Sequence, residues 1–333
     1  MKAILLRGFG GTENFEMRDD LENPAIPDTH VLVKIKAAGF NPVDYQMRIG
    51  TSEKARLHSP ILGREFSGVV EKAGKFANTF KIGDPVFAAS GSMGSNGSYA
   101  EYISVPESIL SVKPENLSFE EAAAIPVAYL TAIQLVDRLK IDFKDSVLIT
   151  GAAGGVGLAL VKFMIASGHQ KITVTAGNKF SRNHLKKTGL PAESIVDYTG
   201  DQLTERLRNA NRGHDFDICI DLVGAKMAEL SAELVKLNGI YADVTALGTE
   251  KSRSLLFDKG VIIFNISNYA YSLYNKYEWY GNNLRRIASM LSDKVISPPS
   301  LSIFAGLSVK SVTQAHNSLE RNQTNGRKLV MII

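Results

Sequence analysis

Hydrophobic segments that alternate between a strand pattern and a helix pattern run through the middle of the chain, from Ser146 onward. Short apolar, β-prone segments are followed in turn by amphipathic segments with helical spacing. The strand segments are 146–150, 171–176, 194–197, 216–222, 239–245 and 261–266, and the helical ones lie near 155–167, 181–188, 201–209 and 225–236. This alternation predicts right-handed βαβ units and a doubly wound parallel sheet, so the fold class is α/β.

The chain before this region has the pattern of a mainly β domain. Up to about residue 115, short β-rich segments such as 31–37, 67–71 and 85–88 are separated by turns with glycine or proline. The Gly/Ser-rich segment 90–98 predicts a flexible loop, either a lid near a site or a solvated connector. A capping box at Ser118–Glu121 predicts a helix start, and a second helical pattern spans 128–139.

The last part of the chain does not continue the strand–helix alternation. It is rich in tyrosine between 269 and 280, has amphipathic helix patterns at 285–291 and 309–319, and ends in a strand pattern at 328–333. We predict that it returns to the N-terminal domain. The predicted domains are then 1–122 and 268–333, with a dinucleotide-binding domain at 123–267 inserted between them.

A glycine-dense loop, Gly151–Gly157, joins the first apolar strand of the alternating region to a helix-prone segment. Glycines let the backbone turn tightly and approach a pyrophosphate, and the helix that follows offers free N–H groups. Against the G-x-G-x-x-G fingerprint, Ala152 takes the first place and Gly154 and Gly157 the others. We predict that Ala153, Gly154, Gly155, Val156 and Gly157 bind the phosphates; the alternative is an ordinary strand–turn–helix connection.

Composition and charge narrow the class of protein. The 333 residues include 38 basic and 34 acidic ones, and a net charge of +4 is too mild to favour nucleic acid. No apolar run is long enough to span a bilayer, and Met1-Lys2 leads directly into a short strand pattern, so we expect no signal peptide. The single cysteine, Cys219, excludes an internal disulfide, fits core packing and favours the reducing cytoplasm.

Seven motifs occur in a fixed order along nearly the whole chain: Asn41–Asp44, Gly63–Val70, Lys81–Phe87, Gly97–Tyr102, Ala123–Pro126, Gly151–Gly157 and Gly326–Lys328. With this ordered set the chain resembles the zinc-independent quinone oxidoreductases (zeta-crystallin-like) of the medium-chain dehydrogenase/reductase superfamily. The resemblance implies a GroES-like catalytic domain that contains a Rossmann domain, with a cofactor cleft between the two. It also implies hydride transfer from NADPH, usually by a homodimer.

The resemblance also bears on metal binding. Zinc members of the superfamily use a cysteine, a His-Glu pair and a further ligand. That cysteine would fall near 38–41, where this chain has none, and the His-Glu position is Arg64-Glu65. The six histidines are scattered without ligand spacing. We therefore expect a metal-free site, which suits an acceptor that delocalises the incoming charge, such as a quinone or an α,β-unsaturated carbonyl.

The residues after the second strand of the alternating region favour NADPH over NADH. An NAD-type site usually places an acid about 20 residues beyond the glycines, to bind the ribose 2′-OH. Here that strand ends at Asn178, and Lys179 and Arg182 follow, where a 2′-phosphate requires cations. Tyr198 resembles the family tyrosine that contacts this phosphate. The alternative is a solvated basic helix start.

Further candidates come from the resemblance. It implies nicotinamide-side contacts by Asn41 and Thr131, whose alternatives are a turn residue before proline and an ordinary helical threonine. Tyr45 is the side chain that best offers a hydroxyl to the acceptor, although relatives often place this phenol one residue later. Solvent is the other source of the proton. Arg327 and Lys328 are candidates for phosphate contacts from the C-terminal strand.

Three functions remain open from the sequence. They are an NADPH-dependent quinone reductase, an NADPH-dependent enone or alkenal double-bond reductase on the same scaffold, and an RNA-binding or structural, crystallin-like protein. Pocket shape distinguishes the two reductases, and the sequence does not give it. No basic–aromatic stripe supports RNA binding.

Segment 261–266 is the last strand of the alternating series and should lie at an edge of the parallel sheet. It contains neither charge nor proline, and such an edge requires protection from aggregation. We predict a homodimer in which this strand pairs with its own copy. The alternative is that the tyrosine-rich segment from 269 folds back to cover it.

Overall fold

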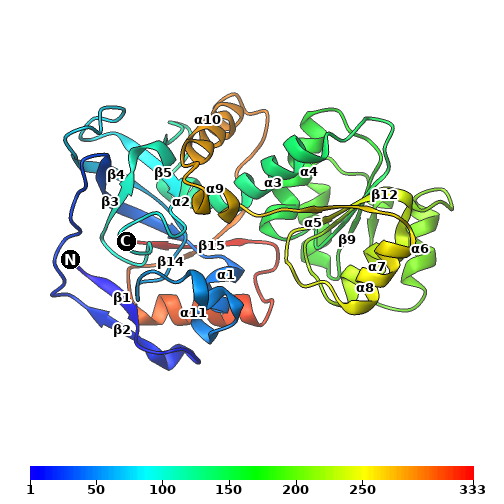
Figure 1. Ribbon diagram of the computed structural model, residues 1–333, viewed down its shortest axis with the longest axis horizontal. Coiled ribbons are helices and arrows are strands. Elements are labelled where there is room, and N and C mark those ends of the chain that lie inside the picture. The colour runs from blue at the N-terminus through cyan, green and yellow to red at the C-terminus, as the bar shows by residue number, and fades with distance from the viewer. The chain divides into compact units, whose positions relative to one another are not determined.

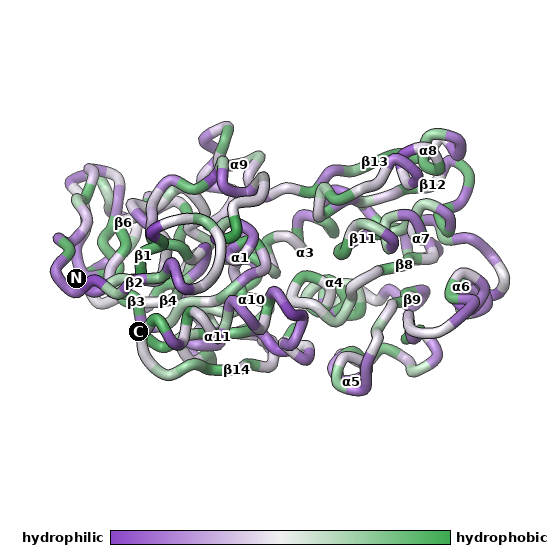
Figure 2. Tube along the Cα trace, turned by 90° about the horizontal axis from the view of Figure 1, so that it is seen from below, coloured by the Kyte–Doolittle hydropathy of each residue, from purple (hydrophilic) through white to green (hydrophobic). Residues whose placement is uncertain are grey.

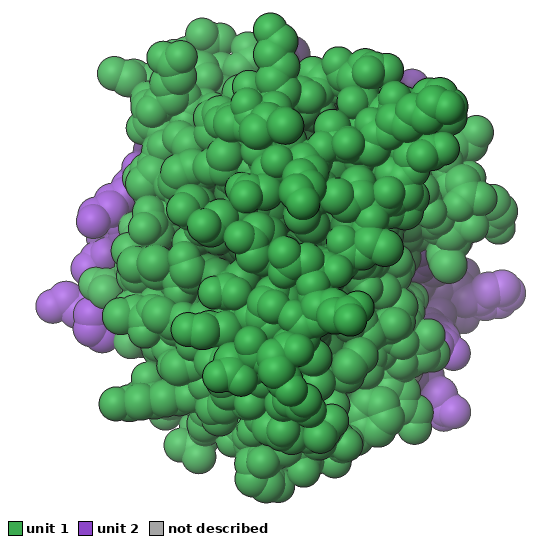
Figure 3. Space-filling view, turned by 90° about the vertical axis from the view of Figure 1, so that its left-hand side faces the viewer, with its two compact units in different colours: residues 1–130, 269–333 green, residues 131–268 purple. Residues whose placement is uncertain are grey.

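A computed structural model describes residues 1–51 and 53–333 in full, and the chain divides into two compact units. Unit 1 combines residues 1–130 with 269–333, and unit 2 consists of residues 131–268 (Figure 3). Unit 2 begins later than residue 123, because Ala123 and Ala124 pack against Ala37 and Val330 in the core of unit 1.

Unit 2 is built on a six-stranded sheet in which every strand pair is parallel. The order is β10-β9-β8-β11-β12-β13, and Figure 1 labels β9 and β12 of this sheet. In chain order this is 3-2-1-4-5-6, the order of dinucleotide-binding Rossmann folds, so the predicted doubly wound sheet is confirmed. The strands are β8 (Val147–Thr150), β9 (Ile172–Thr175), β10 (Ile195–Val196), β11 (Phe216–Asp221), β12 (Val235–Asp243) and β13 (Ile262–Asn265).

Helices connect these strands as the sequence pattern predicts. They are α4 (Gly155–Ala166), α5 (Lys179–Lys186), α6 (Leu203–Ala210), α7 (Lys226–Leu234) and α8 (Glu250–Asp258), and α3 (Pro126–Leu139) spans the start of the unit. Buried α4 is mostly apolar, whereas α5 and α6 are hydrophilic (Figure 2). Helix α8 was not predicted, since its sequence is polar; the Thr249 hydroxyl caps its first turn by accepting a hydrogen bond from the N–H of Ser252.

Unit 1 holds a seven-stranded sheet of order β14-β15-β3-β4-β5-β7, with β6 also pairing with β3, and a separate hairpin of β1 and β2. The strands are β1 (Ala3–Leu6), β2 (Phe15–Arg18), β3 (His30–Gly39), β4 (Glu65–Ala73), β5 (Pro85–Ala89), β6 (Tyr102–Pro106), β7 (Ser111–Val112), β14 (Leu301–Phe304) and β15 (Lys328–Ile332). The helices are α1 (Pro42–Ile49), α2 (Phe119–Ala123), α9 (Tyr269–Leu273), α10 (Glu278–Ser292) and α11 (Val309–Glu320). C-terminal strand β15 lies between β14 and β3, as the predicted return to the N-terminal domain requires.

The Gly/Ser-rich segment 90–98 is not the solvated connector or flexible lid that its composition suggests. Ser90 and Ser98 are fully buried, and the Asn96 amide donates to the carbonyls of Gly97 and Tyr102 at 2.8 and 3.1 Å. A Cβ added at Gly97 would lie 2.1 Å from the carbonyl oxygen of Leu62. The small residues of this loop therefore allow close packing inside unit 1.

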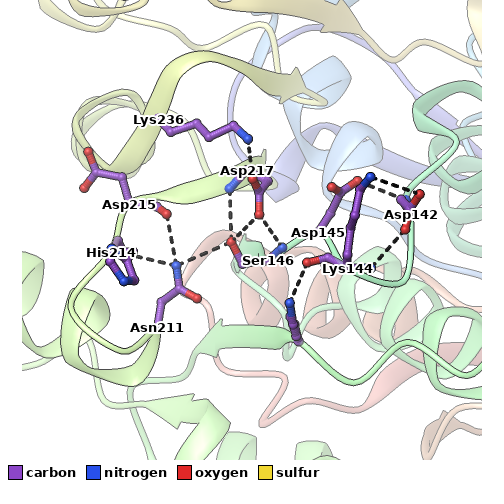
Figure 4. A network of polar contacts seen from close by, with 10 residues as sticks. Asp142, Lys144, Asp145, Ser146, Asn211, His214, Asp215, Asp217 and Lys236 are labelled. Carbon is purple, nitrogen blue, oxygen red and sulfur yellow. Dashed lines mark hydrogen bonds and ion pairs between the residues drawn. The ribbon is translucent and has the colours of Figure 1, made fainter.

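A polar network ties together the amino-terminal ends of the central strands in unit 2 (Figure 4). Asp217 on β11 accepts hydrogen bonds from the Ser146 N–H and hydroxyl, both at 2.7 Å, and forms an ion pair with Lys236 of β12. Burial alone would raise the pKa of Asp217, but the hydrogen bonds from Lys236 and Ser146 outweigh it and lower the pKa to about 2. These contacts lie at the edge of the sheet opposite the glycine loop, so their role is structural.

The variant Asp217→Asn is expected to lower the free energy of unfolding of unit 2 by about 1 kcal/mol at neutral pH. Since the folded state lowers the pKa of Asp217 from 3.8, the stability it provides is present above about pH 4 and is lost as the pH falls towards about 2. Urea titrations across that window should show a smaller decline for the variant than for wild type. An equal change in exposed Asp258→Asn would contradict this role.

No helix among the described residues has both the length and the apolar character that a membrane span requires.

Candidate functional site

The glycine loop of unit 2 has the geometry of a phosphate cradle. Gly151 takes a left-handed conformation at φ +70°, and a Cβ at Gly157 would lie 2.4 Å from the Cα of Ala152. Gly154 is the N-cap of α4 and provides no side chain to its first N–H groups, and both Gly154 and Gly155 are exposed. Ala153 and Val156 complete the loop. An anionic phosphate fits this helix N-terminus.

The loop lies at the point of the sheet where the strand order reverses, between β8 and β11, which is where Rossmann folds bind their ligand. Buried Asp221, at the end of β11, accepts hydrogen bonds from the Thr150 hydroxyl at 2.7 Å and from the N–H groups of Val223 and Gly224 at 3.0 Å. These bonds fix the turn after β11 beside Gly151, whose added Cβ would lie 2.7 Å from Val223. Asp221 was not among the residues predicted from the sequence.

The predicted 2′-phosphate residues gather at the ends of β9 and β10. The ring of Tyr198 lies against Gly177, where a Cβ would be 2.3 Å from the tyrosine Cζ. Asn178 caps α5, its side chain accepting from the Ser181 N–H at 2.9 Å, and Lys179 is exposed at the first position of that helix.

Arg182 forms an ion pair with Asp197 in this structure, and the sequence analysis missed this pair. Hydrogen bonds from the Thr199 hydroxyl and N–H to Asp197 come first among the causes that lower its pKa, ahead of Arg182. The signal was present in the sequence, since Asp197 stands directly before Tyr198. The guanidinium predicted to bind a 2′-phosphate is therefore already paired with a carboxylate in this structure.

In unit 1, Asn41 belongs to a buried polar network with two opposite charges. Its amide nitrogen donates to Glu65 Oε1 at 2.9 Å, and its Oδ1 accepts from Lys328 Nζ at 2.5 Å. Lys328 also pairs with Glu65 at 2.6 Å, and Glu65 Oε2 accepts from the Val127 N–H at 2.8 Å. Asn41 is therefore held in one orientation, as a cofactor-positioning residue requires.

The structure corrects the expectation that Lys328 extends to a phosphate. Its ammonium group is buried on β15 and engaged by Glu65 and Asn41, because β15 is an inner strand of the sheet. Arg327, the residue before it, is exposed. Arg327 lies just before β15, whereas Lys328 is its first residue and is followed by three further buried ones.

Tyr45 and Asp44 follow Asn41 on α1. Tyr45 is half-buried, and Asp44 is fully buried with its Oδ2 accepting from the Asn41 N–H at 2.7 Å. Burial raises the pKa of Asp44 to about 7, partly offset by that hydrogen bond and by the charge of Arg64. Thr131, at the start of unit 2, accepts a hydrogen bond from the Asn268 amide at 3.0 Å, so its hydroxyl has an identified partner within that unit.

In the described part of the chain, no three His, Cys, Asp or Glu side chains gather in a way that could hold a metal ion.

Two family models match the chain: an alcohol dehydrogenase GroES-like domain over residues 27–115, and a zinc-binding dehydrogenase domain over residues 155–289. The human protein named quinone oxidoreductase is 32% identical over 250 residues, which are 75% of this chain and 74% of the relative.

The chain belongs to the quinone oxidoreductases of the medium-chain dehydrogenase/reductase superfamily. A quinone oxidoreductase structure from Pseudomonas syringae matches all of the chain and 99% of its own, with 25% identity and a TM-score of 0.87. An Arabidopsis thaliana relative named NADPH-dependent alkenal/one oxidoreductase, chloroplastic, is 28% identical and covers 81% of this chain and 69% of its own length. Membership of this family makes the protein an oxidoreductase that uses a nicotinamide cofactor, and the phosphate cradle of unit 2 fits that cofactor.

Proposed function

We propose that the protein is an NADPH-dependent reductase that transfers a hydride to a quinone and works without zinc. The observation that carries this proposal is the chemistry around Asn41. The buried acids beside it, Glu65 and Asp44, face an ammonium from Lys328 and the charge of Arg64 rather than metal ligands. Similarity to the human quinone oxidoreductase supports the choice of acceptor.

The residues of the chain would mainly bind and orient the two reactants. When bound, the nicotinamide supplies the hydride. The α4 N-terminus binds phosphate, and the fixed amide of Asn41 orients the nicotinamide side. A quinone spreads the added negative charge over its ring, so it reacts with modest electrostatic help. The half-buried hydroxyl of Tyr45, or solvent, would return the proton.

The preference for NADPH rests on the group formed by Lys179, Arg182 and Tyr198. Two cations and a hydroxyl suit a dianionic 2′-phosphate better than a neutral 2′-hydroxyl. The name of the Arabidopsis relative agrees with this preference.

Steady-state oxidation of NADPH against a panel of quinones, enones and alkenals, with and without chelator, tests the proposed function. We expect the highest kcat/KM with a quinone, lower activity with NADH, and no effect of chelator. Activity that is lost in chelator and restored by zinc would overturn the metal-free mechanism. A much higher kcat/KM for alkenals would instead favour a double-bond reductase, which the resemblance to the Arabidopsis relative also supports.

We further propose that the enzyme is a homodimer joined through β13. This strand is an edge of its sheet, and Ile262 and Ile263 are 56% and 49% exposed. An apolar edge without charge or proline is open to pairing with another chain. The tyrosine-rich segment proposed as an alternative cover belongs to unit 1, where Tyr269 packs against Arg56 and Arg64.

The single cysteine is buried, which suits a reducing compartment such as the cytoplasm.

The variant Ile263→Lys is expected to shift the dimer towards monomer by at least about tenfold in dissociation constant, because a charge would be buried between the paired edges. Sedimentation velocity at micromolar concentration measures the change. Ile303→Lys is the matched control, since Ile303 is 53% exposed on β14, the edge strand of the other sheet. A dimer weakened only by the control would place the interface on unit 1.

A further inference from the structure

Arg64, immediately before β4, is a buried guanidinium in unit 1. It is only 5% exposed, and its Nη2 is enclosed without a hydrogen-bond partner among the described residues. Burial lowers the pKa of Arg64 to about 10, which leaves the side chain protonated at neutral pH. A buried cation without a hydrogen-bonded anion is unfavourable, and where it persists it indicates a site prepared for a ligand.

A second arginine, Arg56, contacts the same aromatic ring but has its positive charge neutralised by a carboxylate. The guanidinium groups of Arg64 and Arg56 both face the ring of Tyr269, with Cζ atoms 4.9 and 4.0 Å from its centroid. Arg56 is more exposed and donates to both carboxylate oxygens of Glu53, at 2.9 and 2.8 Å. Arg64 has the same aromatic contact but no such carboxylate in the described part of the chain.

Asp44 is the carboxyl whose charge acts most strongly on Arg64, but it is a weak counter-ion. Its charge leads the interactions that favour the protonated guanidinium, yet its hydrogen bonds come from the Asn41 N–H, to Oδ2, and from the Tyr99 hydroxyl, and Oδ1 has no partner among the described residues. Burial also raises the pKa of Asp44, which weakens it as a counter-ion. The charges of Asp44 and Glu53 both act on Arg64, but Asp44 bonds to the Asn41 N–H and Glu53 to Arg56, so the guanidinium has no hydrogen-bonded carboxylate among the described residues.

A small cavity adjoins Arg64. It has a volume of about 10 Å³ and is lined mainly by apolar or glycine residues, among them Met47, Leu57, Ile61 and Leu62. That volume holds a single oxygen atom. The next residue along the chain, Glu65, accepts a hydrogen bond from Asn41. Two neighbouring residues at the start of β4 thus contact the cavity and the proposed nicotinamide-side residue.

We propose that Arg64 is an oxyanion-binding catalytic residue, whose guanidinium binds the acceptor oxygen that gains negative charge during reduction. This inference rests on the proposed function. A hydride adds two electrons and one hydrogen to the acceptor, so a quinone becomes a phenolate and an enone becomes an enolate. A proton from solvent then gives the hydroquinone or the saturated carbonyl. A guanidinium that is already desolvated stabilises the anion more than the neutral carbonyl.

This role also assigns a substrate class. The acceptor is a small conjugated carbonyl compound, with its oxygen at an apolar wall rather than in water. By the resemblance, Arg64 stands where zinc relatives have a metal-binding histidine. The proposed role explains why a cation stands at that position. A fixed organic cation performs the charge stabilisation that a Lewis acid performs in those relatives.

Binding of 4-nitrophenol to the full chain tests the inference without turnover. Its absorption reports ionisation directly, and its phenolate resembles the anionic product. On wild type we expect the bound phenol to ionise at lower pH than in solution, and the phenolate to bind about 10–100-fold more tightly than to Arg64→Met. Arg64→Lys should retain part of the effect. The matched control, Arg56→Met, should behave as wild type, and circular dichroism confirms that each variant is folded.

Turnover provides the second measurement. Arg64→Met should lose on the order of 10²-fold in kcat/KM for a quinone, mainly in kcat. Phenolate binding that is absent in wild type, or unchanged in both Arg64 variants, overturns the inference. If wild type reduces quinones and Arg64→Met does so equally well, only the inference fails. If wild type reduces no acceptor while Arg64 still governs phenolate binding, the proposed reaction fails and the anion site stands.

Discussion

Replacing Lys328 by methionine is expected to lower the free energy of unfolding of unit 1 by about 3–5 kcal/mol. The ammonium group lies on an inner strand and is the ion-pair partner of fully buried Glu65. Methionine has nearly the same length and fills the space, so the loss measures charge rather than packing. Removing one partner of a buried pair leaves the other charge without compensation, which is the costly case.

The double variant Glu65→Gln/Lys328→Met separates this explanation from a general packing defect. It removes both charges, while a glutamine oxygen still accepts from the Val127 N–H. The Asn41 amide then turns over, so that its oxygen accepts from the glutamine nitrogen at the place where its own nitrogen donates to Glu65 in wild type. We expect the double variant to recover at least about 2 kcal/mol of the loss. Denaturant titrations of the three proteins measure this. A double variant as unstable as Lys328→Met alone would show that the charge of Glu65 is not the cause.

Replacing Arg182 by alanine is expected to weaken NADPH binding by about 1.5–3 kcal/mol, or roughly 10–100-fold, and to leave NADH nearly unchanged. The reason is that the guanidinium would contact only the 2′-phosphate, which NADH lacks. Quenching of protein fluorescence by each cofactor gives the two dissociation constants. Equal weakening of both cofactors would place the 2′-phosphate pocket elsewhere.

Asp197 supplies the control for this prediction. In the free protein it forms an ion pair with Arg182, so the phosphate must displace it. Asp197→Asn should therefore bind NADPH at least as tightly as wild type, whereas a carboxylate that bound the ribose itself would make the same variant weaker. The two variants together distinguish competition from direct recognition.

The parts of this protein that were predictable from sequence are those whose signal is local. The glycine loop and its flanking strand and helix follow from backbone geometry within about a dozen residues, and the strand–helix alternation predicts a doubly wound parallel sheet through the handedness of its crossovers. The capping box at Ser118 likewise uses only neighbouring residues.

What sequence reasoning missed depends on contacts between distant residues. Lys328 and Arg327 are neighbours with the same charge, and only the position of β15 inside the sheet makes one buried and the other exposed. Segment 90–98 has the composition of a loose loop, but Gly97 has to be a glycine because the backbone of Ile61 and Leu62 lies against it, and Gly94 lies against Ile103. In neither case does the local sequence carry the deciding information.

Because β15 follows unit 2 in the sequence, the order in which the chain is synthesised affects how unit 1 folds. All of unit 2 has been made before residue 269, so its sheet can close while the rest of the chain is still being translated. Unit 1 completes its sheet only afterwards, because the strand between β14 and β3, which carries the cation for Glu65, follows unit 2 in the sequence. Maturation of the nascent chain therefore runs from the inserted domain outward. A chain that stops before residue 328 would carry all of unit 2 attached to a unit 1 in which β14 and β3 lack the strand that lies between them.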